Sequence, residues 1–359
     1  MSALFNKCIK HLEHLVSFDT SNPPKNIEGS GLLDYLKSLD FIKPEITNLG
    51  ENSYNILCSR GNPRYLFNVH LDTVPQCDGW NTHPLDLIIT NSHAIGLGAC
   101  DIKSAAACIL AVIEEGLEDY AVLFSTDEEA GQSRCIKTFA KSKLEYQGII
   151  VAEPTNNLAV TCHRGIATGS IRFHGTSGHS SEKSALENSA IHKQARWSFN
   201  ALETARKYEN KKYESLEGLA FNIGSVSGGI KPNIIAQSAE TKFGFRPLPG
   251  QDPFEIFTEL NAKSVKGQFD FTKGFIAPSL PAKNNSHRLK ALAGKLKLEL
   301  SKPVNFWTEA ALFNEAGYDA IVFGPGDIKN AHQPNEYVDL ANLKTCLLYT
   351  SDAADDAGS

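Results

Sequence analysis

Apolar stretches of strand length alternate with helical patterns in the first half of the chain, and this alternation restricts the possible folds most strongly. Strand-like stretches begin at Tyr65, Ala121 and Gly148, and helical patterns over residues 102–116 and 134–142 separate them. The pattern is typical of an α/β fold with a mixed, mostly parallel sheet and flanking helices. Each stretch ends in histidine or acidic residues, and ligands of open α/β sheets bind beyond the carboxyl ends of the strands. We therefore expect these polar groups to converge at one edge of the sheet.

The sequence pattern changes between residues 166 and 277, where the signals follow the order strand, helix, strand, strand, helix. This order predicts a compact α+β unit inserted into the α/β domain. We expect a catalytic domain formed by residues 1–165 and 278–345, with an inserted lid and dimerisation domain over 166–277. In residues 346–359 small and acidic residues replace the apolar periodicity, so we expect a tail that is either non-native or disordered.

Composition and charge exclude several classes of protein. The 359 residues are 42% hydrophobic, enough for a large core, and the net charge of −6 offers no basic surface for nucleic acids or anionic membranes. The amino-terminal stretch carries polar residues at helical spacing and lacks the unbroken apolar segment of a secretory signal. Eight scattered cysteines without a Cys-x-x-Cys pair indicate reduced thiols. We expect a cytoplasmic protein.

The stretch that begins at Tyr65 continues into the sequence NVHLDTVP, which places His70 and Asp72 two residues apart. On an extended strand both side chains lie on the same face. A carboxylate can accept the proton of one imidazole nitrogen and leave the other nitrogen to bind a metal. An ordinary hydrogen bond between the two side chains is the alternative.

The sequence GLGACDIKSAAA places Asp101 between a glycine-rich turn and the start of a helix. A carboxylate at this position is either a metal ligand or the N-cap of the helix. We interpret Lys103, two residues later, as a solvated helix residue.

Three consecutive carboxylates, Asp127, Glu128 and Glu129, follow the apolar stretch that begins at Ala121. Buried carboxylates repel one another, and a divalent cation beside them offsets that repulsion. Glu128 and Glu129 cannot both point to one ion from an extended backbone, which suggests that one ligates while the other faces the reacting centre. A solvated acidic loop is the alternative.

Two further candidate ligands follow strand-like stretches later in the chain. Glu153 lies at the end of the stretch from Gly148, and His332 lies in a loop rich in glycine and proline after the segment AIVFG. Together the candidates supply two imidazoles and three carboxylates, a donor set that suits Zn²⁺ or Co²⁺ and can hold two ions if one carboxylate bridges them. The five candidates are His70, Asp101, Glu129, Glu153 and His332.

The sequence resembles the M20-type metallopeptidase family, which contains acetylornithine deacetylases, aminoacylases, succinyl-diaminopimelate desuccinylases and carboxypeptidases. The resemblance is strongest to the acetylornithine and acetylcitrulline deacetylase branch and extends from about Leu12 to Tyr337. The motifs that carry it are HLDTVP, GLGACDIK, TDEEAG, VAEPT, GTSGHSS, FRPLPG, WTEA and GPGDIKNAHQPNEY.

The resemblance implies a site for two metal ions. One ion would be bound by His70, Asp101 and Glu153. The other would be bound by Asp101, Glu129 and His332, so that Asp101 bridges the pair.

The resemblance also implies catalytic roles. Asp72 would orient His70, and Glu128 would be the general base that takes a proton from a metal-bound water and later gives one to the leaving amine. His179, in the GTSGHSS motif, would reach the active site of a partner subunit and stabilise the tetrahedral oxyanion. A simple turn histidine is the alternative for His179.

Further residues are implied to bind the substrate of a homodimeric enzyme. Arg246 and Asn233 match positions that bind the α-carboxylate of the substrate, with an interface ion pair and a turn residue as the alternatives. Arg164 lies at the domain junction and is either a substrate contact or a hinge-packing residue. Glu309 matches a residue that this branch keeps near the metals, and we count it with the substrate-binding residues.

The expected reaction is removal of the acetyl group from N-acetyl-L-ornithine or N-acetyl-L-citrulline in arginine biosynthesis. The reaction type follows from the metal donors together with Glu128, whereas the substrate follows from the family branch. The alternatives are a different acyl-amino acid or dipeptide substrate and a non-catalytic protein that binds metal or peptide.

Overall fold

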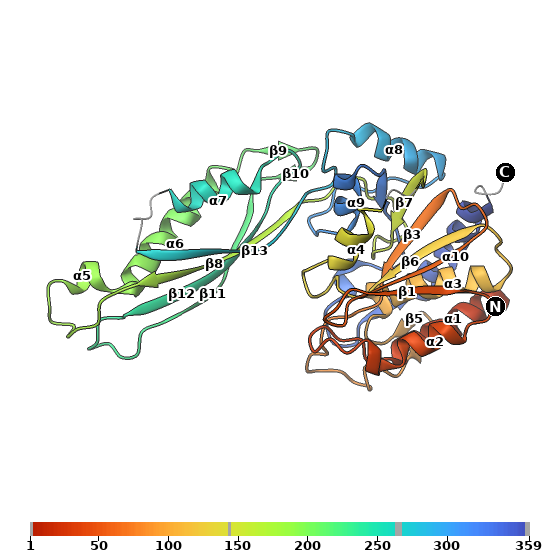
Figure 1. Ribbon diagram of the computed structural model, residues 1–359, viewed down its shortest axis with the longest axis horizontal. Helices are drawn as coiled ribbons and strands as arrows, with labels where there is room; N and C mark the ends of the chain where they lie inside the picture. Colours follow the sequence, from red (N-terminus) through yellow and green to blue (C-terminus); the bar gives the residue numbers. More distant parts are fainter. Residues whose placement is uncertain (1–2, 143–144, 263–267, 356–359) are drawn as a thin grey trace. The chain divides into compact units, whose positions relative to one another are not determined.

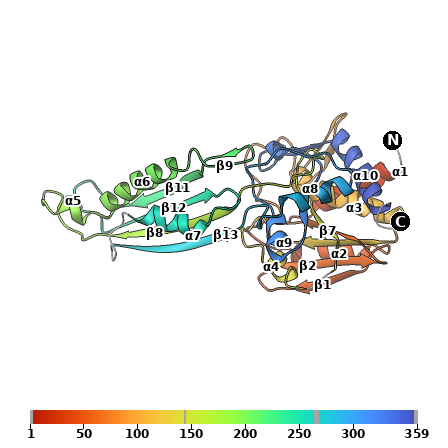
Figure 2. The same ribbon diagram turned by 90° about the horizontal axis from the view of Figure 1, so that it is seen from above.

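The computed structural model describes residues 3–142, 145–262 and 268–355. The chain forms two compact units, and Figures 1 and 2 show the elements of each. The first unit comprises Met1–Thr161, Asn285–Lys302 and Thr308–Ser359. The second unit comprises Cys162–Asn284 and Pro303–Trp307.

A six-stranded sheet forms the centre of the first unit (Figure 1). In spatial order its strands are β1 (Pro44–Asn48), β2 (Tyr54–Arg60), β6 (Tyr120–Ser125), β3 (Tyr65–His70), β7 (Gly148–Val151) and β14 (Ala320–Val322). The last four strands run parallel to one another, and β2 and β1 continue the sheet in antiparallel pairing. The predicted mixed, mostly parallel sheet is confirmed.

Helices pack on both faces of this sheet (Figure 1). Helix α3 is buried from Ser104 to Ile113 because it packs against α1 and α10, which explains why this segment is apolar all round. Helices α8 and α9 pack against β14. The helices of this unit are α1 (Ala3–Ser17), α2 (Leu32–Ser38), α3 (Ser104–Glu114), α4 (Arg134–Phe139), α8 (Ser286–Lys295), α9 (Ala310–Ala316) and α10 (Leu340–Asp355).

Shorter elements complete the first unit. Strands β4 (Ile88–Ile89), β5 (His93–Ile95) and β15 (Tyr337–Asp339) form a small separate sheet in the order β15-β5-β4. Short helical turns are η1 (Glu28–Ser30), η2 (Ala99–Lys103) and η3 (Ile328–Asn330). Within the described ranges, none of the helices combines the length and the hydrophobicity that a membrane span requires.

The parallel strands bring their carboxyl ends to one edge of the sheet. His70, the last residue of β3, lies beside Ser125, the last residue of β6. On the other side of β3, the ends of β7 and β14 are paired through Val151 and Val322. The segments after these four strands therefore start from neighbouring positions, as expected for a ligand site in an α/β sheet.

The second unit has an antiparallel sheet in the order β11-β12-β8-β13, and helices α6 and α7 cover one of its faces (Figure 1). Trp197 of α6 and Phe257 of α7 pack against Phe243 in its core. Its elements are β8 (Ile166–His174), α5 (Ala185–Asn188), α6 (Ala190–Arg206), β9 (Lys212–Tyr213), β10 (Leu216–Glu217), β11 (Ala220–Gly228), β12 (Ser238–Arg246), α7 (Pro253–Asn261) and β13 (Phe269–Ala277).

The structure differs from the expected order of elements in the second unit. The first of the two helices expected in this unit is broken at Ser189, whose extended backbone separates α5 from α6. Strand β13 follows α7 and was not expected from the pattern, yet it pairs along β8 and completes the sheet.

The boundaries of the units also differ from those expected. The backbone of His163 pairs with that of Leu280, which ties the segments on both sides of the expected 165/166 and 277/278 junctions to the second unit. At the other end of the chain, α10 continues past residue 346 to Asp355, with Cys346 and Leu347 buried where a tail was expected. Residues 356–359 of the expected tail lie outside the described residues.

Candidate metal centre

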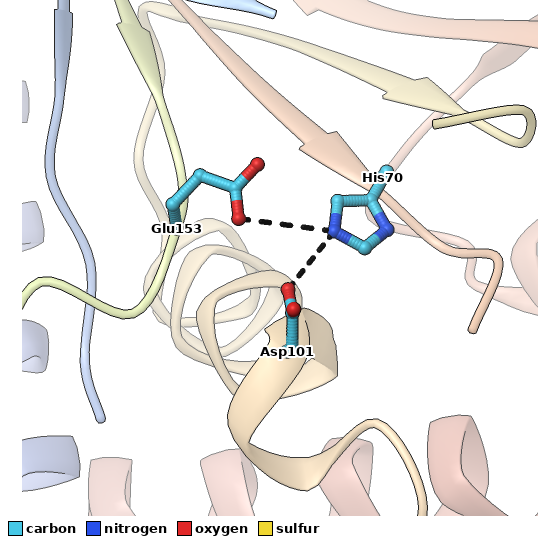
Figure 3. A group of neighbouring side chains, drawn as sticks. All are labelled: His70, Asp101 and Glu153. Carbon is cyan, nitrogen blue, oxygen red and sulfur yellow. Dashed lines mark hydrogen bonds and ion pairs between the residues drawn. The ribbon is translucent and has the colours of Figure 1, made fainter. Parts of the chain in front are cut away.

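Two groups of side chains at the carboxyl ends of the parallel strands could each hold a metal ion. The first consists of His70, Asp101 and Glu153, which point toward one another from β3, η2 and the segment after β7 (Figure 3). Nε2 of His70 lies 3.1 Å from Oδ1 of Asp101 and 4.0 Å from Oε2 of Glu153. All three side chains are buried, so the group is shielded from water.

The second group consists of Asp101, Glu129 and His332. Nε2 of His332 lies 3.2 Å from Oδ2 of Asp101 and 3.0 Å from Oε1 of Glu129. The two oxygens of Asp101 thus face different histidines, which is the arrangement that a bridging carboxylate needs. His332 has a φ of 58°, in the left-handed region that is uncommon for residues other than glycine and is found at functional sites.

Two of the three donor carboxylates resist ionisation, whereas Asp101 does not. Burial, and then the charge of Asp101, raise the pKa of Glu153 well above its usual value. Burial also raises the pKa of Glu129, although the hydrogen bond with His332 opposes the effect. Burial opposes ionisation of Asp101 as well, but hydrogen bonds from His332 and His70 outweigh it and lower that pKa.

The donor set fits divalent cations. Nitrogen and oxygen donors lie within 4.8 Å of one another in each group, and the two imidazoles lie against the carboxylates. A cation in each group would offset the repulsion among the carboxylates. The five predicted ligands are therefore together in two groups that share Asp101.

Glu128 lies beside the donors but belongs to neither group. Burial raises its pKa well above the usual value for glutamate, and the neighbouring charge of Glu129 adds to the effect. A carboxyl group with a raised pKa is suited to move protons near neutral pH. Glu129 therefore belongs to a donor group and Glu128 does not, and the role of Glu128 as the general base stays a prediction.

Asp72 holds the turn that carries these two glutamates. Its carboxylate accepts hydrogen bonds from the main-chain N–H groups of Glu128, at 3.3 Å, and Glu129, at 3.1 Å, and from the side chain of Asn22. Nδ1 of His70 lies 2.9 Å from the main-chain oxygen of Asp72 and 3.6 Å from its carboxylate. Asp72 therefore contacts His70 chiefly through its backbone, while its side chain positions the turn.

Asp127, the first of the three consecutive carboxylates, points away from the donors. It accepts hydrogen bonds from the main-chain N–H groups of Arg134 and Cys135 at the start of α4. A carboxylate is stabilised at a helix amino terminus by these unpaired donors. One of the three adjacent carboxylates is thus stabilised by the helix amino terminus.

Lys103 is buried, which corrects the interpretation of this residue as a solvated helix residue. It is 1% exposed, and its ammonium group donates a hydrogen bond to the main-chain oxygen of Phe18. Burial lowers its pKa to about 7. Helical spacing could not reveal this, because Lys103 ends η2, which packs against α1, α3 and β3.

Glu309 lies near the donors in the first unit. It is 1% exposed, it accepts a hydrogen bond from Ser125 at the end of β6, and burial raises its pKa to about 8. Its position beside the end of β6 agrees with a residue close to the metal donors.

The remaining predicted site residues lie in the second unit. His179 is exposed, with Nδ1 2.8 Å from the hydroxyl of Ser181. Asn233 is exposed in the turn between β11 and β12, and Arg246 is half-buried at the end of β12, where it lines a cavity of about 650 Å³. The roles of these three residues in substrate binding and catalysis stay predictions.

Arg164 is buried and forms its hydrogen bonds within the second unit. It is 4% exposed, and its guanidinium donates hydrogen bonds to Asn305 and to the main-chain oxygens of Glu217, Gly218 and Arg246. These contacts anchor the β10 segment and favour the packing alternative over a substrate contact.

Sequence reasoning missed two residues that support the donors. Asn22 is buried and donates to the carboxylate of Asp72 at 2.9 Å. Glu336 is 1% exposed and accepts hydrogen bonds from the turn that carries Asp101. Glu336 lies in the segment GPGDIKNAHQPNEY, four residues after His332. This spacing does not indicate a contact with the Asp101 turn.

The fold and the two donor groups together fit a metal-dependent hydrolase. The chain belongs to peptidase family M20/M25/M40, whose sequence model matches residues 66–356. It is 44% identical over 352 residues to the N-acetyl-L-citrulline deacetylase of Xanthomonas campestris pv. campestris, covering 96% of each chain. It is 29% identical over 342 residues to the acetylornithine deacetylase of Proteus mirabilis, covering 87% of this chain and 85% of that one.

Solved structures show the same fold. An M20 family metallo-carboxypeptidase from Sulfolobus solfataricus superposes with a TM-score of 0.76 at 17% identity, covering 99% of both chains. A Bacillus subtilis protein described as a dinuclear metal binding peptidase of the M20 family superposes with a TM-score of 0.65 at 13% identity, covering 98% of both chains.

Proposed function

We propose that the protein hydrolyses the acetyl amide of N-acetyl-L-citrulline, as a step of arginine biosynthesis. The observation that carries the proposal is the pair of donor groups that share Asp101 beside the half-buried Glu128. The choice of substrate is supported by the 44% identity to an N-acetyl-L-citrulline deacetylase, against 29% to an acetylornithine deacetylase. N-acetyl-L-ornithine is the alternative substrate.

The metal ions are proposed to be Zn²⁺, with Co²⁺ as a functional replacement. Two imidazoles and three carboxylates are borderline donors that both ions accept. When bound, such ions polarise the amide carbonyl and lower the pKa of water. His70, Asp101 and Glu153 would hold one ion, and Asp101, Glu129 and His332 the other.

Glu128 is proposed to move the proton in this reaction. It accepts a proton from the attacking water as the carbon–oxygen bond forms, and it delivers that proton to the amide nitrogen as the carbon–nitrogen bond breaks. The products are acetate and the free amino acid. Burial of Glu128 keeps its pKa above that of an exposed glutamate, which favours both halves of the transfer.

The substrate is tested by direct assay. Metal-free protein is reloaded with Zn²⁺ or Co²⁺ and supplied with acetylcitrulline, acetylornithine, acetylmethionine or succinyl-diaminopimelate, and the released amine is measured. We expect the highest kcat/KM for acetylcitrulline. Faster cleavage of another acyl amide would overturn the substrate and leave the reaction type intact, whereas no cleavage of any of them would overturn the reaction itself.

Residues of the second unit are proposed to bind the substrate. Arg246 would pair with the α-carboxylate, since a guanidinium binds a carboxylate through two hydrogen bonds, and Asn233 would assist it. His179 would stabilise the oxyanion of the tetrahedral intermediate. Substitution Arg246→Ala is then expected to raise KM, and His179→Ala to lower kcat.

The enzyme is proposed to act as a cytoplasmic homodimer. The eight cysteines, all within the described ranges, are not joined in disulfides, which agrees with a reducing compartment. In the second unit, α6 exposes Phe199 and Leu202, at 66% and 47%, and the edge strand β11 exposes Val226, at 55%. Exposed apolar groups and an open sheet edge are features of association surfaces. Sedimentation velocity of the wild type and of Phe199→Glu tests the dimer.

A further inference from the structure

Glu336 is a buried carboxylate that binds the turn before α3 rather than any side chain of the donor groups. Its Oε1 accepts hydrogen bonds from the main-chain N–H groups of Cys100 and Asp101, both at 2.9 Å, and its Oε2 accepts one from Gly98 at 3.1 Å. Its main-chain oxygen accepts a fourth hydrogen bond from Gly96. One residue therefore satisfies four N–H groups of a single six-residue turn.

The turn depends on this acceptor for its shape. Gly98 has a φ of 76°, and a Cβ there would lie 2.6 Å from Cγ2 of Thr73. Any other residue at this position would therefore have a strained backbone and a close contact with Thr73. Three N–H groups that point to one side in a buried turn need an acceptor, because unpaired buried donors are costly. A carboxylate is the strongest acceptor that a side chain offers.

Glu336 also connects the turn that carries Asp101 to the loop that carries His332. Glu336 directly precedes β15, the strand that pairs with β5. It follows His332 by four residues. A second contact joins the same two loops, because the thiol of Cys100 donates to the main-chain oxygen of Asp327. The His332 loop and the Asp101 turn are therefore fixed to each other through Glu336.

We propose that Glu336 is a positioning residue that holds the Asp101 carboxylate between His70 and His332, so that one side chain can serve both metal ions. This inference rests on the proposed metal-dependent function. Glu336 does not contact the metal donors' side chains, and it acts only through the main chain of the turn. Supporting residues of this kind commonly affect metal affinity by roughly 10–100-fold.

The test is Glu336→Gln, which keeps the size of the side chain but replaces one acceptor oxygen by a donor NH₂ group. At least one N–H group of the turn then loses its acceptor. The matched control is Glu114→Gln at the other end of α3, where the same exchange weakens the contact with His11. Binding of Co²⁺ is followed by calorimetric titration and by the visible absorption of the bound ion, which reports its coordination geometry.

We expect Glu336→Gln to weaken Co²⁺ binding by roughly 10–100-fold, to change the absorption spectrum, and to lower kcat at saturating metal with little change in KM. Glu114→Gln is expected to behave as the wild type. An unchanged affinity and spectrum for Glu336→Gln, or equal losses in the control, would overturn the inference. Wild-type protein that binds no Co²⁺ would instead overturn the proposed function.

A second measurement covers the case in which Glu336→Gln does not fold. In metal-free wild-type protein, hydrogen exchange of the amides of Gly98, Cys100 and Asp101 is compared with that of exposed loops and of α3. We expect protection close to that of α3, because these amides bond to a buried carboxylate. Exchange as fast as in exposed loops would contradict the inference.

Discussion

The Oδ2 atom of Asp72 lies 3.1 Å from the main-chain nitrogen of Glu129. Asp72 lies two residues after the end of β3, and this hydrogen bond fixes the turn that follows β6. Asn22 also donates a hydrogen bond to this oxygen of Asp72, at 2.9 Å. Because His70 is oriented by the main-chain oxygen of Asp72, the side chain of Asp72 serves the second donor group more than the first.

Substitution Asp72→Asn should therefore act on the turn. We expect Asp72→Asn to lower kcat by roughly 10–100-fold and to weaken the binding of the ion held by Glu129 and His332. The ion held by His70 should bind nearly as before. A metal titration that resolves two binding steps checks this, and selective loss of the ion at His70 would show that the carboxylate orients the imidazole instead.

Substitution Glu128→Gln should separate chemistry from binding. The amide cannot accept the proton of the attacking water, so kcat should fall by roughly 10²–10⁴-fold while KM and the metal content stay close to those of the wild type. Glu118→Gln, at an exposed position of the same unit, is the control and should keep full activity. Steady-state kinetics with metal analysis decides the matter, and retained turnover in Glu128→Gln would refute the assignment of the base.

Removal of the metal ions should destabilise the first unit. Three neighbouring donor carboxylates, of which Asp101 and Glu153 are buried, would lose their compensating cations. A ligand present at 100 times its Kd stabilises a folded protein by about 2.7 kcal/mol. Calorimetry with and without a chelator should show a lower unfolding temperature without metal, and readdition of Zn²⁺ should reverse it. Identical unfolding curves would mean that these groups bind no ion in the folded protein.

Acid should destabilise the second unit through His163. This residue is fully buried, and burial lowers its pKa from 6.5 to about 4. Below pH 6.5 the unfolded chain takes up a proton that the folded chain refuses, so the stability present above that pH is lost as the pH falls toward 4. A shift of this size corresponds to about 3 kcal/mol.

The substitution His163→Asn tests this pH dependence. Its urea midpoint should fall less between pH 7 and pH 4.5 than that of the wild type. His192→Asn, at an exposed position of the same unit, should follow the wild type. Equal pH slopes for wild type and His163→Asn would show that folding does not shift the pKa of His163.

The metal donors could be predicted from sequence because each follows a recognisable local pattern. His70, Glu129 and Glu153 come just after apolar strands, and Asp101 lies where a glycine-rich turn meets a helix. The topology of a parallel sheet then places such segments together without any knowledge of long-range contacts. The family resemblance added the pairing of donors into two groups.

Other features depend on contacts that no local pattern encodes. Glu336 reaches the Asp101 turn only because β15 pairs with β5, some 240 residues earlier in the chain. Lys103 has ordinary helical spacing, and its burial follows from the packing of η2 against α1, α3 and β3. Strand β13 is confirmed as a strand only by its pairing with β8, which lies about 100 residues away.

The central claim is that side chains from four strand ends and one helix start converge to hold metal ions. The most direct test is an anomalous diffraction map of crystals grown with Zn²⁺. The account predicts two peaks, one within bonding distance of His70, Asp101 and Glu153, and the other within bonding distance of Asp101, Glu129 and His332. Peaks only at other positions, or no peak in metal-saturated crystals, would contradict it.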